Sequence, residues 1–192
     1  MIDWVDKRFP QRKKLRLQGY DYSQAGMYFV TICTINRLSL LGYIVGADDP
    51  VRPLKEHISP FDKSFNPYIK LTEIGQIVSD CWHKIDSIYE NVKTDAFCVM
   101  PNHVHGIIVI ENKDETSDRD SKTGGQSRPP LQKVVQGFKS VTTRMCFEFD
   151  YHKIWQRSYH DRIIRTEEEY LKICKYIQEN PETWLQDCYY ER

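Results

Sequence analysis

Two features that would direct a chain to a membrane or an oxidising compartment are missing from this sequence of 192 residues. No apolar run approaches the roughly 20 residues that a membrane-spanning helix needs. The start of the chain, residues 1–6, lacks the basic and apolar segments of a secretory signal or transit peptide. The six cysteines lie far apart and form no Cys-x-x-Cys pair, which favours reduced, mostly buried thiols over a disulfide or zinc framework. We therefore expect a cytoplasmic protein with one globular domain over residues 1–192.

An excess of positive charge is also missing. The chain has 27 Lys and Arg residues against 27 Asp and Glu, so its net charge gives no argument for a nucleic-acid partner. The distribution is uneven, because residues 1–20 carry six cations against two acids and residues 133–165 carry seven against three. Each region is either a contact for a polyanion or an ordinary solvated basic face.

The strands are expected where β-branched and aromatic residues cluster. Residues 28–35 predict a buried strand and residues 40–45 a second one. Residues 95–110 are expected to be extended, with a bulge or a new strand entry at 100–102 because proline cannot donate to a central ladder. The proline-rich segment 46–67 is expected to be a loop insertion.

Helical spacing of apolar residues predicts three helices, at about 72–89, 131–145 and 166–180. The polar segment at about 111–130 has too few apolar residues to be buried and is expected to be a flexible loop. This order of elements favours an α+β fold in which the helices pack on one face of an antiparallel sheet. Alternating β-α-β units with parallel strands are the less supported alternative.

His103-Val104-His105 places two imidazoles on the same face of a strand, because side chains alternate along it. The spacing alone says little, since roughly 0.2 such pairs are expected by chance in a chain of this composition. The context adds weight, because apolar segments flank the pair and a buried imidazole without a partner is costly. A metal ion is one such partner.

The last helix offers further candidates for the same site. Tyr170 falls on the apolar stripe of this helix and is interpreted as a packing residue. Tyr176 lies off the stripe, with Asn180 one turn later on the same flank. A tyrosine of ordinary pKa, about 10, is a poor nucleophile at neutral pH unless a nearby cation helps its proton to leave. The alternative for Tyr176 is a half-buried aromatic residue at a helix edge.

Aromatic and cationic residues alternate between positions 153 and 165, a mixture that suits unpaired bases and their phosphates. For Trp155 and Tyr159 packing in the core is an equally good interpretation. His57, His83, His152 and His160 are interpreted as ordinary surface or packing residues. The candidate DNA contacts are Arg12, Lys13, Lys14, Arg16, Lys139, Trp155, Arg157, Tyr159, Arg162 and Arg165.

Taken in order along the chain, these motifs resemble a known family. The matching segments are Tyr20-Asp21-Tyr22, Gly26, 28–34, 99–106, 137–140, Thr143, 155–159, 163–165 and 176–181. The set resembles the IS200-like tyrosine transposases and especially their REP-associated relatives, which are single-tyrosine HUH endonucleases. Each segment alone is unspecific, whereas the ordered set is specific.

The resemblance implies a ferredoxin-like α+β fold, with the HUH motif on a central strand and the catalytic tyrosine on a C-terminal helix. It implies that His103, His105 and Asn180 bind Mg²⁺ or Mn²⁺ and that Tyr176 is the nucleophile. Related transposases often have glutamine where this chain has Asn180.

The implied reaction is cleavage of single-stranded or hairpin DNA by Tyr176, which leaves a 5′-phosphotyrosine link and a free 3′-hydroxyl. Rejoining then needs no ATP, and the sequence has neither a Gly-x-x-x-x-Gly-Lys loop nor a Gly-x-Gly-x-x-Gly turn. The protein is expected to be a monomer or a homodimer.

Two other interpretations stay open. A histidine-triad-like nucleotide hydrolase also has alternating histidines on a strand, but Ile107 stands where its third histidine would fall. A protein that binds hairpin nucleic acid without cleaving it would keep the fold and lose the chemistry.

Overall fold

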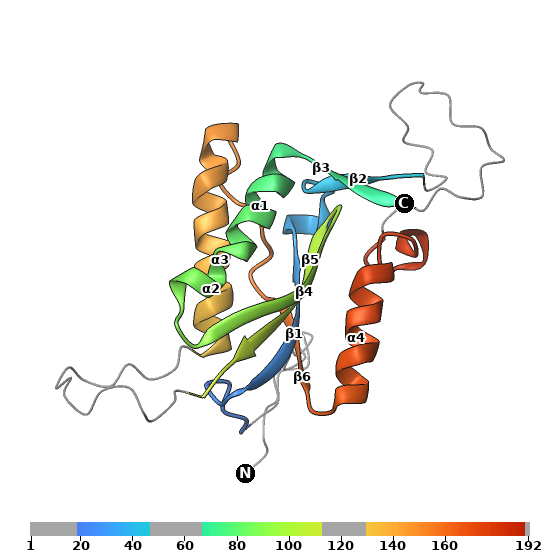
Figure 1. Ribbon diagram of the computed structural model, residues 1–192. Coiled ribbons are helices and arrows are strands. Elements are labelled where there is room, and N and C mark those ends of the chain that lie inside the picture. Colours follow the sequence, from blue (N-terminus) through green and yellow to red (C-terminus); the bar gives the residue numbers. More distant parts are fainter. Residues whose placement is uncertain (1–18, 47–66, 113–129, 191–192) are drawn as a thin grey trace, which may run out of the picture.

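The centre of the molecule is a four-stranded antiparallel sheet, seen in the computed structural model, which describes residues 19–46, 67–112 and 130–190 (Figure 1). Its strand order is β4-β5-β1-β6. The strands are β1 (Gly26–Cys33), β4 (Val92–Met100), β5 (His103–Ile110) and β6 (His160–Ile164). With α1 between β1 and β4 and α3 between β5 and β6, the order is β-α-β-β-α-β, the ferredoxin-like arrangement. The expected α+β fold with an antiparallel sheet is confirmed.

β5 is buried on both of its faces. Val104, Ile108 and Ile110 contribute to the larger apolar core, whereas Ile107 contributes to a second core on the other side of the sheet. A strand that is covered on both sides reads as a nearly continuous apolar run, as residues 107–110 do. The two histidines of β5 are therefore in the interior of the molecule.

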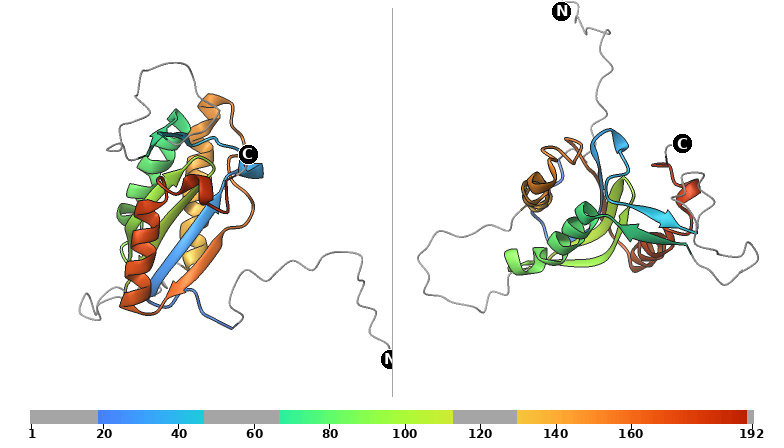
Figure 2. Two further views of the ribbon diagram at one scale, coloured as in Figure 1. Left: turned by 90° about the vertical axis from the view of Figure 1, so that its right-hand side faces the viewer. Right: turned by 90° about the horizontal axis from the view of Figure 1, so that it is seen from above.

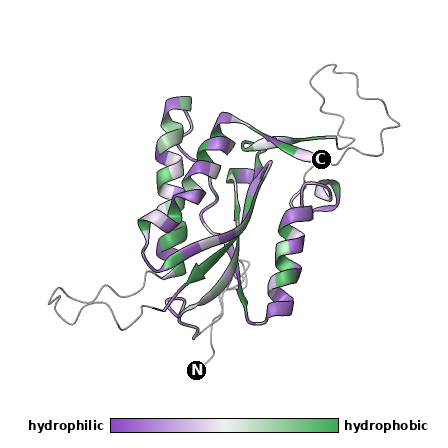
Figure 3. Ribbon diagram, in the orientation of Figure 1, coloured by the Kyte–Doolittle hydropathy of each residue, from purple (hydrophilic) through white to green (hydrophobic). Residues whose placement is uncertain are grey.

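The helices lie on both faces of the sheet, which corrects the expectation of helices on one face (Figure 2). α1 (Glu73–His83), α2 (Ile85–Ile88) and α3 (Leu131–Met145) are on one side. α4 (Glu167–Glu179) covers the other side, where Ile173 and Ile177 pack with Ile107. The sheet needs this second layer because the apolar side chains of β5 alternate between both faces. Figure 3 shows that the strands at the centre are largely hydrophobic, while the helices carry both polar and apolar residues.

A tight turn joins β4 to β5. Met100 pairs with His103, so the chain reverses at Pro101 and Asn102 and forms a hairpin. Of the two irregularities expected at 100–102, the bulge is wrong and the new strand entry is confirmed, because the proline lies in the turn before β5 and not in the ladder. The bulge of this pair lies earlier, between Thr94 and Phe97.

A small two-stranded sheet, β2 (Gly42–Val45) with β3 (Tyr68–Leu71), precedes α1. β2 agrees with the expected second strand, and β3 was not predicted. The short 3-10 helices are η1 (Ile35–Arg37), η2 (Cys146–Phe149) and η3 (Trp184–Gln186). The expected loop at 46–67 and the flexible loop at about 111–130 lie almost wholly outside the described residues.

α4 begins where the sequence predicts. Thr166 is the N-cap, and its hydroxyl accepts a hydrogen bond from the Glu169 backbone N–H at 3.2 Å. The Glu169 carboxylate accepts one from the backbone N–H of Arg165 at 3.0 Å. The first bond is one half of a capping box, and the second satisfies the backbone N–H of Arg165, one residue before the N-cap. The helix ends at Glu179, and Asn180 is its C-cap, directly before Pro181.

The described residues include all six cysteines, of which three are buried, two are partly buried and Cys188 is exposed. All six cysteines are free, and Cys33, Cys81 and Cys146 are buried. Across residues 19–46, 67–112 and 130–190, no helix combines the length and apolarity needed to cross a bilayer.

Candidate active site and metal centre

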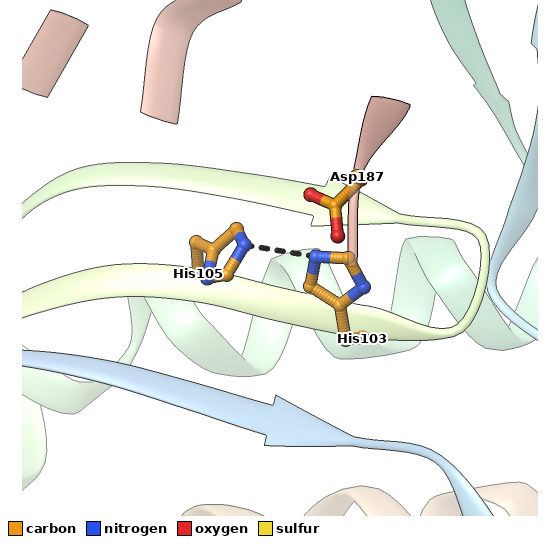
Figure 4. A group of neighbouring side chains, drawn as sticks. All are labelled: His103, His105 and Asp187. Atoms are coloured by element: carbon orange, nitrogen blue, oxygen red, sulfur yellow. Dashed lines mark hydrogen bonds between the residues drawn. The ribbon is translucent and has the colours of Figure 1, made fainter. Parts of the chain in front are cut away.

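His103 and His105 lie side by side on β5, opposite Cys33 and Thr31 of β1. Both side chains are buried, with exposed fractions of 0% and 1%. Their Nε2 atoms face each other at 2.9 Å (Figure 4). The strand thus presents two imidazole nitrogens at one point.

The outer nitrogen of each ring has its own partner. Asn102 Nδ2 donates to the backbone carbonyl of Tyr189 at 2.8 Å, which turns Asn102 Oδ1 toward His103 Nδ1, also at 2.8 Å. Because that oxygen can only accept, His103 carries its proton on Nδ1 and has a lone pair on Nε2. His105 Nδ1 lies 2.9 Å from the Thr31 hydroxyl. Such outer contacts orient histidines that bind metals.

Burial keeps both histidines neutral. It lowers the pKa of His103 to about 3, and the nearby positive charge of Arg37 lowers it further in the same direction. It also lowers the pKa of His105 well below its ordinary value, with a smaller contribution from His103. Neutral imidazoles are the form that binds a metal ion, so the pair is ready to do so at neutral pH.

Tyr176 reaches the histidine pair from α4. Ile173 and Ile177 fix the helix against Ile107, and this packing directs the Tyr176 hydroxyl to 3.2 Å from His105 Nε2. The side chain is 41% exposed, so it borders both the buried histidines and the solvent. The helix-edge position agrees with the sequence pattern.

Tyr170 and Tyr159, the other tyrosines discussed in the sequence, lie away from the histidine pair. Tyr170 donates to Asp95 Oδ2 on β4 at 2.6 Å. Tyr159 is buried in the larger core, on the α1 and α3 side. Of Tyr159, Tyr170 and Tyr176, only Tyr176 contacts the histidine pair.

The phenol of Tyr176 is protonated at neutral pH. Burial raises its pKa above the ordinary value, and the negative charge of Asp187 raises it further. A phenolate would therefore form here only with help from a cation.

Asn180 lies one turn beyond Tyr176, at the C-cap of α4, and is fully buried. Its Nδ2 donates to Asp187 Oδ2 at 3.0 Å. Its Oδ1 is buried and has no hydrogen-bond partner among the described residues. An amide oxygen in this state can serve a cation.

Asp187 is a site residue that the sequence analysis missed. It follows η3, and its Oδ2 accepts from the Tyr176 hydroxyl at 3.3 Å. Ligand atoms of His103, His105 and Asp187 all lie within 4.8 Å of one another (Figure 4). The residue belongs to an irregular segment seven positions after Asn180, where no helical or strand period connects it with the other site residues.

The segment around Asp187 covers the histidines. The rings of Tyr189 and Trp184 lie 4.7 and 5.9 Å from the ring of His103, measured between centroids. Arg37 lies over the Tyr189 ring, 5.4 Å from its centroid. Arg37, from η1, is a second residue near the site that the sequence analysis did not select.

The residues present fit a divalent cation. Two ligand atoms that each lie about 2.1 Å from one ion, at a right angle, are about 3.0 Å apart. The two Nε2 atoms are 2.9 Å apart, and a carboxylate and an unpartnered amide oxygen lie beside them. His103 and His105 could thus hold a metal together with Asn180, Asp187 or both.

Two of the candidate DNA contacts are packing residues. Trp155 is 4% exposed and its Nε1 donates to Thr142 Oγ1 at 2.8 Å. Tyr159 is 7% exposed. Both side chains are buried, which agrees with the packing interpretation of the two residues.

The remaining candidate DNA contacts differ in how exposed their side chains are and in the partners that they have. Lys139 Nζ donates to the backbone carbonyls of Gln156 and Arg157, so it fixes the segment before β6. Arg157 and Arg165 are exposed, and Arg162 is exposed and paired with Glu169. Arg12, Lys13, Lys14 and Arg16 lie outside the described residues.

An open groove of about 500 Å³ runs between α3 and the segment before β6. Its lining is basic and aromatic, with Arg144, Phe147, Lys153 and Arg157 among its residues. It lies on the α3 side of the sheet, whereas Tyr176 lies on the α4 side.

Comparison with known proteins found a relative by sequence and a similar fold among solved structures. No family model matches the sequence. Among solved structures, a REP-associated tyrosine transposase bound to a REP hairpin is similar, with a TM-score of 0.52 and 20% identity. The likeness covers 86% of this chain and 72% of that one. At this identity it shows that the chain has the fold of the tyrosine transposases.

The sequence relative places the chain in a family. An uncharacterized protein of Haemophilus influenzae is 33% identical over 187 residues, which cover 93% of each chain. The chain belongs to the family of that protein.

Proposed function

We propose that the protein is a metal-dependent single-stranded-DNA endonuclease and strand transferase of the transposase kind, with Tyr176 as the nucleophile. The single observation that carries the proposal is the 3.2 Å distance between the Tyr176 hydroxyl and His105 Nε2. A tyrosine beside two neutral, inward-facing imidazoles is the arrangement that phosphodiester cleavage through a phosphotyrosine needs.

His103 and His105 would hold a divalent ion, Mg²⁺ or Mn²⁺, with an oxygen ligand from Asn180 or Asp187. When bound, such an ion polarises the scissile phosphate and stabilises developing negative charge. Tyr176 loses its proton as its oxygen forms the bond to phosphorus. The bond to the 3′ oxygen breaks, and that oxygen gains a proton. The products are a 5′-phosphotyrosine and a free 3′-hydroxyl, and the reverse reaction rejoins DNA without ATP.

The proposed substrate is single-stranded DNA that forms a hairpin. The structurally similar transposase is bound to a REP hairpin, and this chain has its fold. The groove lined by Arg144, Lys153 and Arg157 offers cations for a phosphate backbone. Arg37 would add a positive charge close to the histidines, where a phosphate must approach. Because Tyr176 and the histidines of one chain already meet, a monomer would be sufficient for cleavage.

The two alternative functions, a histidine-triad hydrolase and a hairpin binder without activity, require different residues at this site. A histidine-triad hydrolase needs a third histidine at position 107, where Ile107 is packed against α4. A binder without activity needs no tyrosine beside the histidines. Hydrolysis of nucleotides that depends on His105 but not on Tyr176 would favour the first, and hairpin binding without any cleavage in Mn²⁺ would favour the second.

The proposal is tested by nicking of a labelled hairpin DNA with a single-stranded tail in Mn²⁺. Tyr176→Phe should abolish cleavage, because phenylalanine has no oxygen to attack with, while DNA binding changes by less than about threefold. Tyr170→Phe, on the same helix, is the matched control and should cleave normally. Undiminished nicking by Tyr176→Phe would refute the proposal.

A further inference from the structure

Two side chains compete for the place of the third metal ligand, Asn180 and Asp187. Resting on the divalent ion of the proposed function, we propose that Asp187 is the third protein ligand and that Asn180 positions its carboxylate. The site would then be built from two elements that are far apart in the sequence, β5 and the segment after η3.

Charge favours the carboxylate. An imidazole must be neutral to bind a metal ion, so His103 and His105 bring no charge that offsets the charge of the ion. A divalent cation bound by two neutral imidazoles and a neutral amide would keep both of its charges in a buried place, which is costly. Arg37 stands nearby and adds a further positive charge. The Asp187 carboxylate offsets part of this charge, and the Asn180 amide cannot.

The hydrogen bonds assign the two residues different tasks. Asn180 presents its amide nitrogen, a donor, to Asp187 Oδ2 at 3.0 Å. The other oxygen, Asp187 Oδ1, accepts from the backbone N–H of Tyr189 at 2.7 Å. The carboxylate is therefore held at both oxygens, as the outer partners of a metal ligand hold it. A buried Asn180 at the end of α4 acts through Asp187.

The same contacts connect the ion with the nucleophile. Asp187 Oδ2 also accepts from the Tyr176 hydroxyl at 3.3 Å, and that hydroxyl is 3.2 Å from His105 Nε2. An ion held by His103, His105 and Asp187 is thus adjacent to the oxygen that attacks. The segment at 184–190 becomes part of the site and does more than cover it.

The test measures binding of Mn²⁺ to the full chain by calorimetry, without DNA. Mn²⁺ is the probe because two imidazole nitrogens favour it over Mg²⁺. Asp187→Asn keeps the shape of the side chain, removes the charge, and should weaken binding by about 100-fold or more. Asn180→Ala should weaken it by about 10-fold, as loss of an orienting partner does. Asp187→Glu should retain more affinity than Asp187→Asn, because the charge is kept.

Controls separate coordination from folding. Asp150→Asn removes a carboxylate that is 98% exposed, and it should leave the affinity unchanged. Near-ultraviolet circular dichroism checks that each variant is folded. With bound Co²⁺ at saturation, Asp187→Asn should shift the absorption bands more than Asn180→Ala does, because it exchanges a ligand atom whereas Asn180→Ala removes only an orienting partner.

An affinity of Asp187→Asn within threefold of wild type, or a larger loss in Asn180→Ala than in Asp187→Asn, would overturn the proposal. These outcomes are independent of the nicking test. If Tyr176→Phe still cleaves DNA, the proposed function fails while the ligand assignment can stand, because it is measured without DNA.

Discussion

At the scale of single residues, the histidine pair depends on partners that the sequence does not mark. Asn102 fixes His103 through Nδ1, and Thr31 contacts His105 in the same way. The sequence placed both histidines on one strand face, because strand alternation requires it. It could not identify Thr31, which is 74 positions away from His105 and reaches it only through the pairing of β1 with β5.

Removal of the Thr31 hydroxyl tests this role. Thr31→Val keeps the shape and should weaken Mn²⁺ binding by about 10-fold, because His105 loses the contact that orients it. Thr143→Val, a similar change on α3 and away from the histidines, should have no effect on Mn²⁺ affinity. Calorimetry measures both, and equal affinities of the two variants would contradict the role of Thr31.

The buried histidines also predict a pH dependence of stability in the metal-free protein. Burial lowers the pKa of His103 from 6.5 to about 3 in the folded state. Below pH 6.5 the unfolded chain binds a proton that the folded chain does not. The contribution of neutral His103 to the free energy of unfolding is therefore complete above pH 6.5 and is lost as the pH falls toward 3.

The free energy of unfolding should fall by roughly 1 to 2 kcal/mol for this histidine between pH 6.5 and pH 5. Urea denaturation in a chelator measures it. His103→Gln should reduce the slope with pH, whereas His152→Gln, with a side chain that is 71% exposed, should keep it. A wild-type stability that rises on acidification would contradict the account.

At the scale of elements, α4 determines where Tyr176 lies. Ile177 is 1% exposed and packs on the sheet one residue after Tyr176. The apolar stripe of this helix was readable from the sequence, and so was the position of Tyr176 beside it. The sequence did not show which face of the sheet α4 covers. Periodicity shows which side of a helix is apolar, but it does not show against which face of the sheet that side packs.

Truncation of Ile177 should lower the stability of the protein, because this residue anchors α4 on the sheet. Ile177→Ala should lower the free energy of unfolding by about 2 to 4 kcal/mol, because it leaves a cavity between α4 and β5. Leu171→Ala, on the same helix and 58% exposed, should change it by less than about 0.5 kcal/mol. Urea denaturation compares the two, and similar losses would show that α4 is not anchored through Ile177.

At the scale of the whole molecule, Tyr176 with the histidine pair and the basic groove lie on opposite sides of the sheet. A DNA strand that contacts both would pass around an edge of the molecule. The sequence predicted the fold and the participation of His103, His105 and Tyr176 in one site. It did not predict Asp187, because an irregular segment has no period from which its place could be read.

The basic groove between α3 and the segment before β6 leads to a prediction about DNA binding. The double change Lys153→Glu and Arg157→Glu should weaken hairpin binding at least about 10-fold and reduce its dependence on salt, because fewer phosphates are neutralised. Mn²⁺ affinity should not change. Lys172→Glu with Lys175→Glu, on the exposed side of α4, is the matched control. Fluorescence anisotropy at several salt concentrations measures binding, and equal losses in both double variants would place the DNA elsewhere.

We propose that Tyr176 forms a covalent link to DNA. To detect this link, the protein is incubated with single-stranded hairpin DNA and Mn²⁺, digested with a protease and examined by mass spectrometry. We expect a nucleotide adduct on Tyr176 that is attached through a 5′-phosphate and is absent from His105→Ala. Cleaved DNA without a protein adduct, or an adduct on Tyr170 or Tyr189, would contradict it.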